Sequence, residues 1–185
     1  MRVACVLRGE RGEGMSEVIS YNVHDETMAQ LMDAYGTALF RLCYFMLKDY
    51  ALAEDAVQET FVKAYKGLAQ FQNKNDFSEK SWLNKIAMNT CKDFRRNAWF
   101  RLVDRKADME EFPPPTVEID DGPELMEAIL KLPVKYREVI LLYYYENIKY
   151  EELAKILSIS LSTAHARLAK AKQKLRALLE GRAQI

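Results

Sequence analysis

Basic side chains crowd into one short stretch of a 185-residue chain whose formal net charge is zero. The stretch is SISLSTAHARLAKAKQKLR, residues 158–176, and it contains no acid. Its apolar residues step by three and four, as in a helix that buries one stripe: Leu161, Ala164, Leu168, Ala171, Leu175 and Leu178. The opposite face carries Thr163, Arg167, Lys170 and Lys174. Such a cationic helix face either lies in solvent or binds phosphate.

The residues before this helix complete a second motif. YEELAKIL, residues 150–157, has helical periodicity, and the short turn Ser158-Ile159-Ser160 separates it from the basic helix. Helix, short turn and helix is the layout of the helix-turn-helix, whose second helix enters the major groove of DNA. The turn often contains glycine, and here Ser158 takes that place. The pattern indicates duplex DNA binding.

Charge divides the chain into blocks that the zero net charge conceals. Residues 80–101 hold six basic residues against one acid, and residues 104–127 hold nine acids against two basic residues. The acidic block contains Pro113, Pro114 and Pro115, which favour an extended backbone. We therefore expect an acidic linker, residues 102–121, between two helical modules at 22–101 and 122–181. A solvated acidic surface is an equally good interpretation of the block on its own.

Periodic apolar residues and scarce glycine and proline predict an all-α fold of two small helical domains, the second containing the helix-turn-helix. Three helices are expected in the first module, through residues 31–47, AEDAVQETFVKAY and SWLNKIAMNTCKDFRR. Residues 1–21 are expected to be a disordered leader. RGEG directly before Met15 suggests a translated ribosome-binding site, with Met15 as the true start.

Several classes of protein are disfavoured by what the sequence lacks. The three cysteines form no Cys-x-x-Cys pair, which disfavours a zinc site or a disulfide framework and favours a reducing, cytoplasmic compartment. Cys43 and Cys91 are expected to be core residues. No run approaches the ~20 apolar residues of a membrane span. With no phosphate loop, no paired carboxylates with a base and only His24 and His165 as histidines, we expect no enzyme, no cofactor and no metal.

Four segments, taken in order, resemble an extracytoplasmic-function (ECF) RNA polymerase sigma factor: AEDAVQETFVKAY, SWLNKIAMNTCKDFRR, LPVKYREVILLYYYENIKYEELAKILSIS and LSTAHARLAKAKQKLR. The resemblance covers residues 27–180. It implies sigma region 2, then an acidic linker that mimics nucleic acid in the polymerase channels, then sigma region 4. The implied function is binding to core RNA polymerase, recognition of the −35 and −10 elements and DNA melting for a stress or envelope regulon. Promoter DNA and an anti-sigma factor are the other implied partners.

The resemblance also implies roles for individual residues. Contacts with the polymerase clamp helices are expected from Asp55, Gln58 and Glu59, and region 4 is expected to contact the flap. Contacts with the −10 element are expected from Asn75, Lys85, Asn89, Lys92, Arg95 and Arg96, with Asn89 as the pocket residue for an unstacked base. Contacts with the −35 element are expected from Ser162, Thr163, His165, Arg167, Lys170 and Lys174. The family commonly has Val-Lys-Ser where this chain has Ala164-His165-Ala166, a less cationic face that leaves base preference open and phosphate binding intact.

Blander interpretations stay open beside these. The acids of the second helix also suit an exposed helix flank, and an amide at position 89 also suits a helix cap or the core. The alternative function is a helix-turn-helix regulator that binds duplex operators without core polymerase. Such a regulator binds its duplex unaided, whereas the sigma reading predicts weak duplex binding until core polymerase is present.

Overall fold

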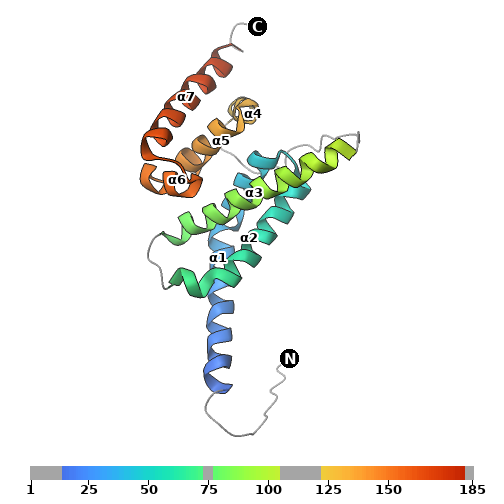
Figure 1. Cartoon of the computed structure of the whole chain (residues 1–185), viewed down its shortest axis with the longest axis vertical. Coiled ribbons are helices and arrows are strands. Elements are labelled where there is room, and N and C mark those ends of the chain that lie inside the picture. Colours follow the sequence, from blue (N-terminus) through green and yellow to red (C-terminus); the bar gives the residue numbers. More distant parts are fainter. Residues whose placement is uncertain (1–13, 73–76, 105–121, 182–185) are drawn as a thin grey trace.

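The computed structural model describes residues 14–72, 77–104 and 122–181, and side chains within 24–71, 77–96 and 122–181. These residues form only helices and their connections, as the all-α prediction requires (Figure 1). In chain order they are α1 (Gly14–Leu47), α2 (Tyr50–Gln72), α3 (Glu79–Asp104), α4 (Pro123–Lys131), α5 (Val134–Ile140), the π-helical η1 (Leu141–Tyr145), α6 (Tyr150–Leu157) and α7 (Leu161–Glu180). Most of the predicted linker, and Asn75, lie outside the described residues.

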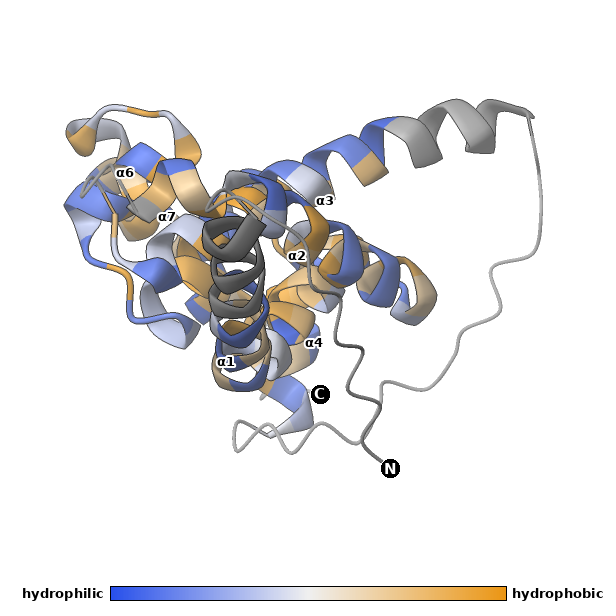
Figure 2. Ribbon diagram, turned by 90° about the horizontal axis from the view of Figure 1, so that it is seen from below, coloured by the Kyte–Doolittle hydropathy of each residue, from blue (hydrophilic) through white to orange (hydrophobic). Residues whose placement is uncertain are grey.

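The first module is a bundle of α1, α2 and α3. Small residues at the helix contacts let the backbones approach closely: Ala53, Ala56, Ala64 and Ala87 are fully buried. Cys43 and Cys91 are also fully buried and free, which confirms their prediction as core residues. Figure 2 shows apolar residues gathered where these helices meet. The long α1 begins at Gly14, so residues 14–21, expected to be a disordered leader, are instead helical.

Local signals end the first helix and begin the second. Lys48 adopts a left-handed conformation with φ of 60°, and α1 ends at the residue before it. The Asp49 side chain then accepts a hydrogen bond from the Leu52 amide at 2.8 Å, an N-terminal cap for α2. A left-handed residue followed by a capping aspartate turns the chain sharply, so α1 and α2 pack side by side.

The second module packs α4 to α7 around buried aliphatic residues. Pro123 occupies the first turn of α4, where its missing amide hydrogen costs nothing, and Pro133 follows the end of that helix. The Glu146 amide donates to the Leu141 carbonyl at 3.0 Å, five residues back, in the manner of a π-helix. This wider turn inserts one residue into the helical period, a feature often found at functional sites.

The turn between α6 and α7 has the geometry that a helix-turn-helix needs. Ser158 ends α6 in the left-handed region, with φ of 55° and ψ of 46°, which confirms that it takes the place of glycine. Ser160 caps α7 by accepting a hydrogen bond from the Thr163 amide at 3.1 Å. Leu161 departs from the predicted stripe: it is 42% exposed, because it lies in the first turn beyond the reach of the core.

A buried arginine joins the two modules. Arg137, on α5, is 4% exposed and donates to the carbonyls of Ile129, Leu130 and Leu132 within its own module. Its Nη1 also donates to the carbonyl of Phe45, on α1, at 2.8 Å. Burial, with Arg95 nearby, lowers the pKa of Arg137 to about 10, which leaves the guanidinium charged at neutral pH. One side chain thus satisfies four backbone acceptors.

We expect Arg137→Met to lower the free energy of unfolding by about 3 kcal/mol or more, because it leaves several buried carbonyls without a donor. Urea denaturation followed by circular dichroism measures the change. Arg176→Met is the matched control, since Arg176 is exposed and pairs only with Glu180 in the described part of the chain. Equal stability of the two variants would contradict the role given to Arg137.

We expect Ser158→Gly to raise the free energy of unfolding by about 0.5–1 kcal/mol. Glycine removes the left-handed strain of about 1–2 kcal/mol, and its larger entropy in the unfolded chain offsets part of the gain. Ala166→Gly, on the exposed face of α7, is the control and is expected to lower stability by about 1 kcal/mol. Thermal unfolding compares the two. A loss of stability in Ser158→Gly would show that the turn does not depend on this conformation.

Candidate nucleic-acid interface

The N-terminal turn of α7 presents hydroxyl groups to solvent. Ser162 is exposed, and its Oγ lies 3.0 Å from the Oγ of Ser160. Thr163 is half-buried, and its Oγ1 lies 2.7 Å from the same Ser160 atom. The two hydroxyls are therefore held at the start of the helix, the part of a recognition helix that contacts base edges.

An aromatic cluster fixes the next predicted residue, His165. Its ring stacks on Tyr150 of α6, with ring centroids 3.8 Å apart and an angle of 21° between the planes. Tyr150 in turn contacts Tyr143, with centroids 5.0 Å apart. Lys172 lies over Tyr143 as well, 5.7 Å from the ring centroid. His165 is thus exposed but restrained by its neighbour.

The three cations predicted along α7 differ in their surroundings. Arg167 is half-buried, whereas Lys170 and Lys174 are exposed. Lys174 Nζ lies 5.7 Å from the ring centroid of Tyr136. Arg167 lies in the second turn of the helix, and Lys174 lies seven residues, or about two turns, further on.

The predicted residues on α3 follow one another along a largely accessible face. Lys85 lies over the ring of Phe77, 4.7 Å from its centroid, and Arg96 pairs with Asp93 at 3.0 Å. Asn89 is exposed in the middle of the helix, so it neither caps the helix nor lies in the core. Its neighbour Met88 is the buried residue. An accessible amide can donate to and accept from a base edge.

Two of the three residues predicted to contact the polymerase are exposed and point away from the bundle core. Asp55 and Gln58 are exposed on α2, and Glu59 is partly accessible. Glu59 lies 3.6 Å from Lys63 Nζ, which also donates to Thr90 on α3 at 3.1 Å. The structure therefore links Glu59 to contacts within the bundle and leaves Asp55 and Gln58 as the accessible pair.

Polar side chains that the sequence analysis did not single out join α3 to the second module. Glu146, 3% exposed, accepts a hydrogen bond from Asn84 and lies 3.3 Å from Lys80 Nζ. Ser81 donates to Glu152 on α6 at 2.7 Å. A charged residue inside the apolar run VILLYYYENI was the available signal, because a buried carboxylate needs a partner.

Glu138 on α5 is a second buried carboxylate, 7% exposed. Burial raises its pKa, and the positive charges of Lys92, Arg167 and Arg95 partly offset the rise. These three cations come from both predicted DNA-binding helices, α3 and α7.

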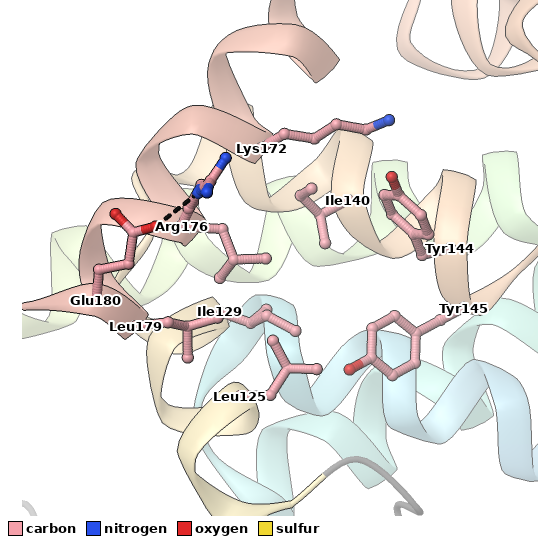
Figure 3. A pocket seen from close by; sticks show the side chains of 10 residues that line it. Leu125, Ile129, Ile140, Tyr144, Tyr145, Lys172, Arg176, Leu179 and Glu180 are labelled. Atoms are coloured by element: carbon pink, nitrogen blue, oxygen red, sulfur yellow. Dashed lines mark hydrogen bonds and ion pairs between the residues drawn. The ribbon is translucent and has the colours of Figure 1, made fainter. Parts of the chain in front are cut away.

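The second module also carries a cavity of about 490 Å³ between α4, η1 and α7. Half of its ten lining residues are aliphatic, Leu125, Ile129 and Leu179 among them, and two more are tyrosines (Figure 3). Lys172 and Arg176 also line it, and Arg176 pairs with Glu180 at 2.6 Å. An apolar cavity bordered by cations suits the apolar side chains of a protein partner.

Within the described ranges, no group of three or more histidine, cysteine, aspartate or glutamate side chains could hold a metal ion. No helix among the same residues has the length and apolar character to cross a bilayer.

Comparison with known proteins matches both modules. Residues 31–101 match Sigma-70 region 2, and residues 123–175 match Sigma-70, region 4. Among curated proteins, the ECF RNA polymerase sigma factor SigW of Bacillus subtilis is 31% identical over 166 residues, covering 82% of this chain and 88% of that protein. SigM of the same organism is 29% identical, covering 82% of this chain and 94% of that protein.

Solved structures show the same arrangement of helices. The sigma factor RpoE of Bartonella quintana, in complex with the anti-sigma factor NepR, has a TM-score of 0.69 at 23% identity, covering 84% of this chain and 96% of that chain. CnrH, in complex with the cytosolic domain of CnrY, has a TM-score of 0.62 at 26% identity, covering 85% and 90%. Both sigma regions are matched in order, and SigW is similar to this chain over most of the length of both proteins. This chain therefore belongs to the family of ECF RNA polymerase sigma factors.

Proposed function

We propose that this sigma factor binds core RNA polymerase, recognises the −35 and −10 elements of its promoters and promotes DNA melting, in the cytoplasm, for a stress or envelope regulon. The observation that carries the proposal is the pair of basic helix faces, on α3 and α7, in two modules that match regions 2 and 4. Two such faces suit two separate DNA elements. A regulator with one helix-turn-helix needs only the basic face of α7 to bind its operator.

Region 2 is proposed to open and hold the −10 element. Arg95 and Arg96 are exposed on α3 and suit contacts with backbone phosphate. The accessible amide of Asn89 lies two turns earlier on the same helix and is proposed to hold an unstacked base. Unstacking a base costs a few kcal/mol, and phosphate and base contacts on one helix together offset that cost. Lys85, Lys92 and Asn75 are proposed to add phosphate contacts.

Region 4 is proposed to recognise the −35 element with α7. Ser162, Thr163 and His165 lie in its first turns, where a recognition helix contacts base edges. The stacking of His165 on Tyr150 supports a fixed orientation of this ring toward the groove. Arg167 is proposed to contact a base, and Lys170 and Lys174 to contact phosphates.

Protein partners are proposed for two other surfaces. Asp55 and Gln58, with Glu59, are proposed to contact the clamp helices of the polymerase. The cavity lined by Leu125, Ile129 and Leu179 is proposed to receive apolar side chains of the polymerase flap or of an anti-sigma factor. RpoE of Bartonella quintana is in complex with the anti-sigma factor NepR, which supports the expectation of an anti-sigma factor.

Run-off transcription with purified core polymerase on a genomic library tests the proposed function. We expect discrete transcripts that require both the protein and the core enzyme, and weak binding of promoter duplexes by the protein alone. Tight, specific duplex binding without core polymerase, together with no transcripts, would instead favour a regulator of the helix-turn-helix class.

We expect Asp55→Arg combined with Gln58→Arg to abolish co-purification with core polymerase and leave helical content unchanged. Both positions are exposed, so the substitutions reverse or add charge on the docking surface without touching the bundle core. Glu151→Arg, an exposed acid on α6, is the control and is expected to co-purify normally. Normal co-purification of the double variant would remove this surface from the account of polymerase binding.

We expect Arg167→Ala and Lys174→Ala to weaken promoter use in different ways. Arg167→Ala should cost roughly 1–3 kcal/mol and relax preference at one −35 position, because a base contact is lost. Lys174→Ala should weaken binding almost uniformly across sequences and lower the salt slope by about one unit. Transcription from promoters mutated at each −35 position, across a salt series, separates the two. Indistinguishable variants would make α7 a nonspecific cationic patch.

A further inference from the structure

The basic block of residues 80–101 contains a single acid, Asp93, and this acid lies beside a proposed DNA-binding residue. Asp93 Oδ1 accepts a hydrogen bond at 3.0 Å from Nη2 of Arg96, which lies one turn further along α3. Both side chains are accessible to solvent. A guanidinium group that is paired with a carboxylate is partly neutralised, so it attracts a phosphate less strongly. Asp93 therefore restrains Arg96 in the free protein.

The other oxygen of Asp93 faces a lysine of α2. Lys63 Nζ lies 4.0 Å from Asp93 Oδ2, and it lies 3.6 Å from Oε1 of Glu59, one turn earlier on α2. The same ammonium group donates to the hydroxyl of the fully buried Thr90 at 3.1 Å, which holds it where α2 and α3 meet. Lys63 is thus shared between two carboxylates, one on each helix.

Four side chains of alternating charge therefore form an ion chain across α2 and α3: Glu59, Lys63, Asp93 and Arg96. Its two ends belong to different proposed interfaces, since Glu59 is proposed to contact the polymerase clamp and Arg96 a phosphate of the −10 element. When another cation pairs with one of two acids that share a lysine, the lysine pairs more fully with the second acid. A change at one end of the ion chain is therefore felt at the other end.

We propose that Lys63 and Asp93 are positioning residues that couple polymerase binding to DNA binding within region 2. The proposal rests on the proposed function, which assigns the two ends of the ion chain. A clamp cation that pairs with Glu59 leaves Lys63 to Asp93, and Asp93 then holds Arg96 less tightly, so the guanidinium group contacts a phosphate. Each step exchanges one accessible ion pair for another, so a coupling of a few fold is expected. By reciprocity, a phosphate on Arg96 strengthens polymerase binding by the same factor.

Binding of the full chain to a fluorescein-labelled single-stranded oligonucleotide, without polymerase, tests this coupling. Glu59→Gln imitates an acid that the clamp has taken, and we expect it to bind about threefold tighter than the unmodified protein. Glu54→Gln, the same change at an exposed position near the start of α2, is the control and is expected to change the affinity less than about 1.5-fold. Asp93→Asn is expected to bind about fivefold tighter and to steepen the salt slope by about 0.7, for one added phosphate contact.

Variants of Lys63 show whether the effect passes through the ion chain. In a Lys63→Met background, Glu59→Gln is expected to leave the affinity unchanged, because the shared cation is gone, whereas Lys63→Arg is expected to keep the threefold effect. Circular dichroism checks the fold. If Lys63→Met loses helical content, Lys63→Gln, which keeps a donor for Thr90, takes its place with the same expectation.

Equal effects of Glu59→Gln and Glu54→Gln would overturn the proposal, as would an effect of Glu59→Gln that persists without Lys63. Failure of Asp93→Asn to bind the oligonucleotide more tightly would also overturn it. Co-purification with core polymerase and run-off transcription test the proposed function separately, so either idea can fail while the other stands.

Discussion

The burial of charge between the two modules is the constraint on which the described arrangement depends. Arg137, Glu138 and Glu146 are each less than a tenth exposed, on a stretch of α5 and η1 that otherwise reads as apolar core. A charge removed from water is tolerated only when hydrogen bonds and opposite charges replace the lost solvation. Backbone carbonyls serve Arg137, and α3 supplies partners for Glu146. Region 4 can therefore bury this stretch only with region 2 against it.

This constraint explains how two small helical modules, joined through an acidic segment, come to share a core. Each module alone has a modest interior, and small domains bury a smaller share of their surface than large ones. The contact between α3 and the second module extends the buried surface, and within it Ser81 and Asn84 donate hydrogen bonds to Glu152 and Glu146. Apolar side chains of both modules belong to the same buried cluster.

Local features were predictable from the sequence because they depend on neighbours along the chain. The helix, short turn and helix around Ser158 follow from local steric and hydrogen-bonding rules. The partners of Arg137 and Glu146 do not, since Phe45 and Asn84 are distant in sequence. Leu161 fits the periodic pattern of apolar residues yet is exposed. Periodicity predicts which face of a helix points inward, but it does not predict how far along the helix the core extends. For the predicted DNA- and polymerase-binding residues, the structure shows which side chains are accessible to solvent. Their roles are proposals.

The central claim is that buried charge holds region 4 against region 2. Pulsed dipolar spectroscopy between spin labels at Gln70 on α2 and Gln173 on α7, both exposed, measures the separation of the modules in a Cys5→Ser background. The account predicts one narrow distance distribution in this background and a broader or longer one when Arg137→Met is added. The same distribution in both proteins would contradict it.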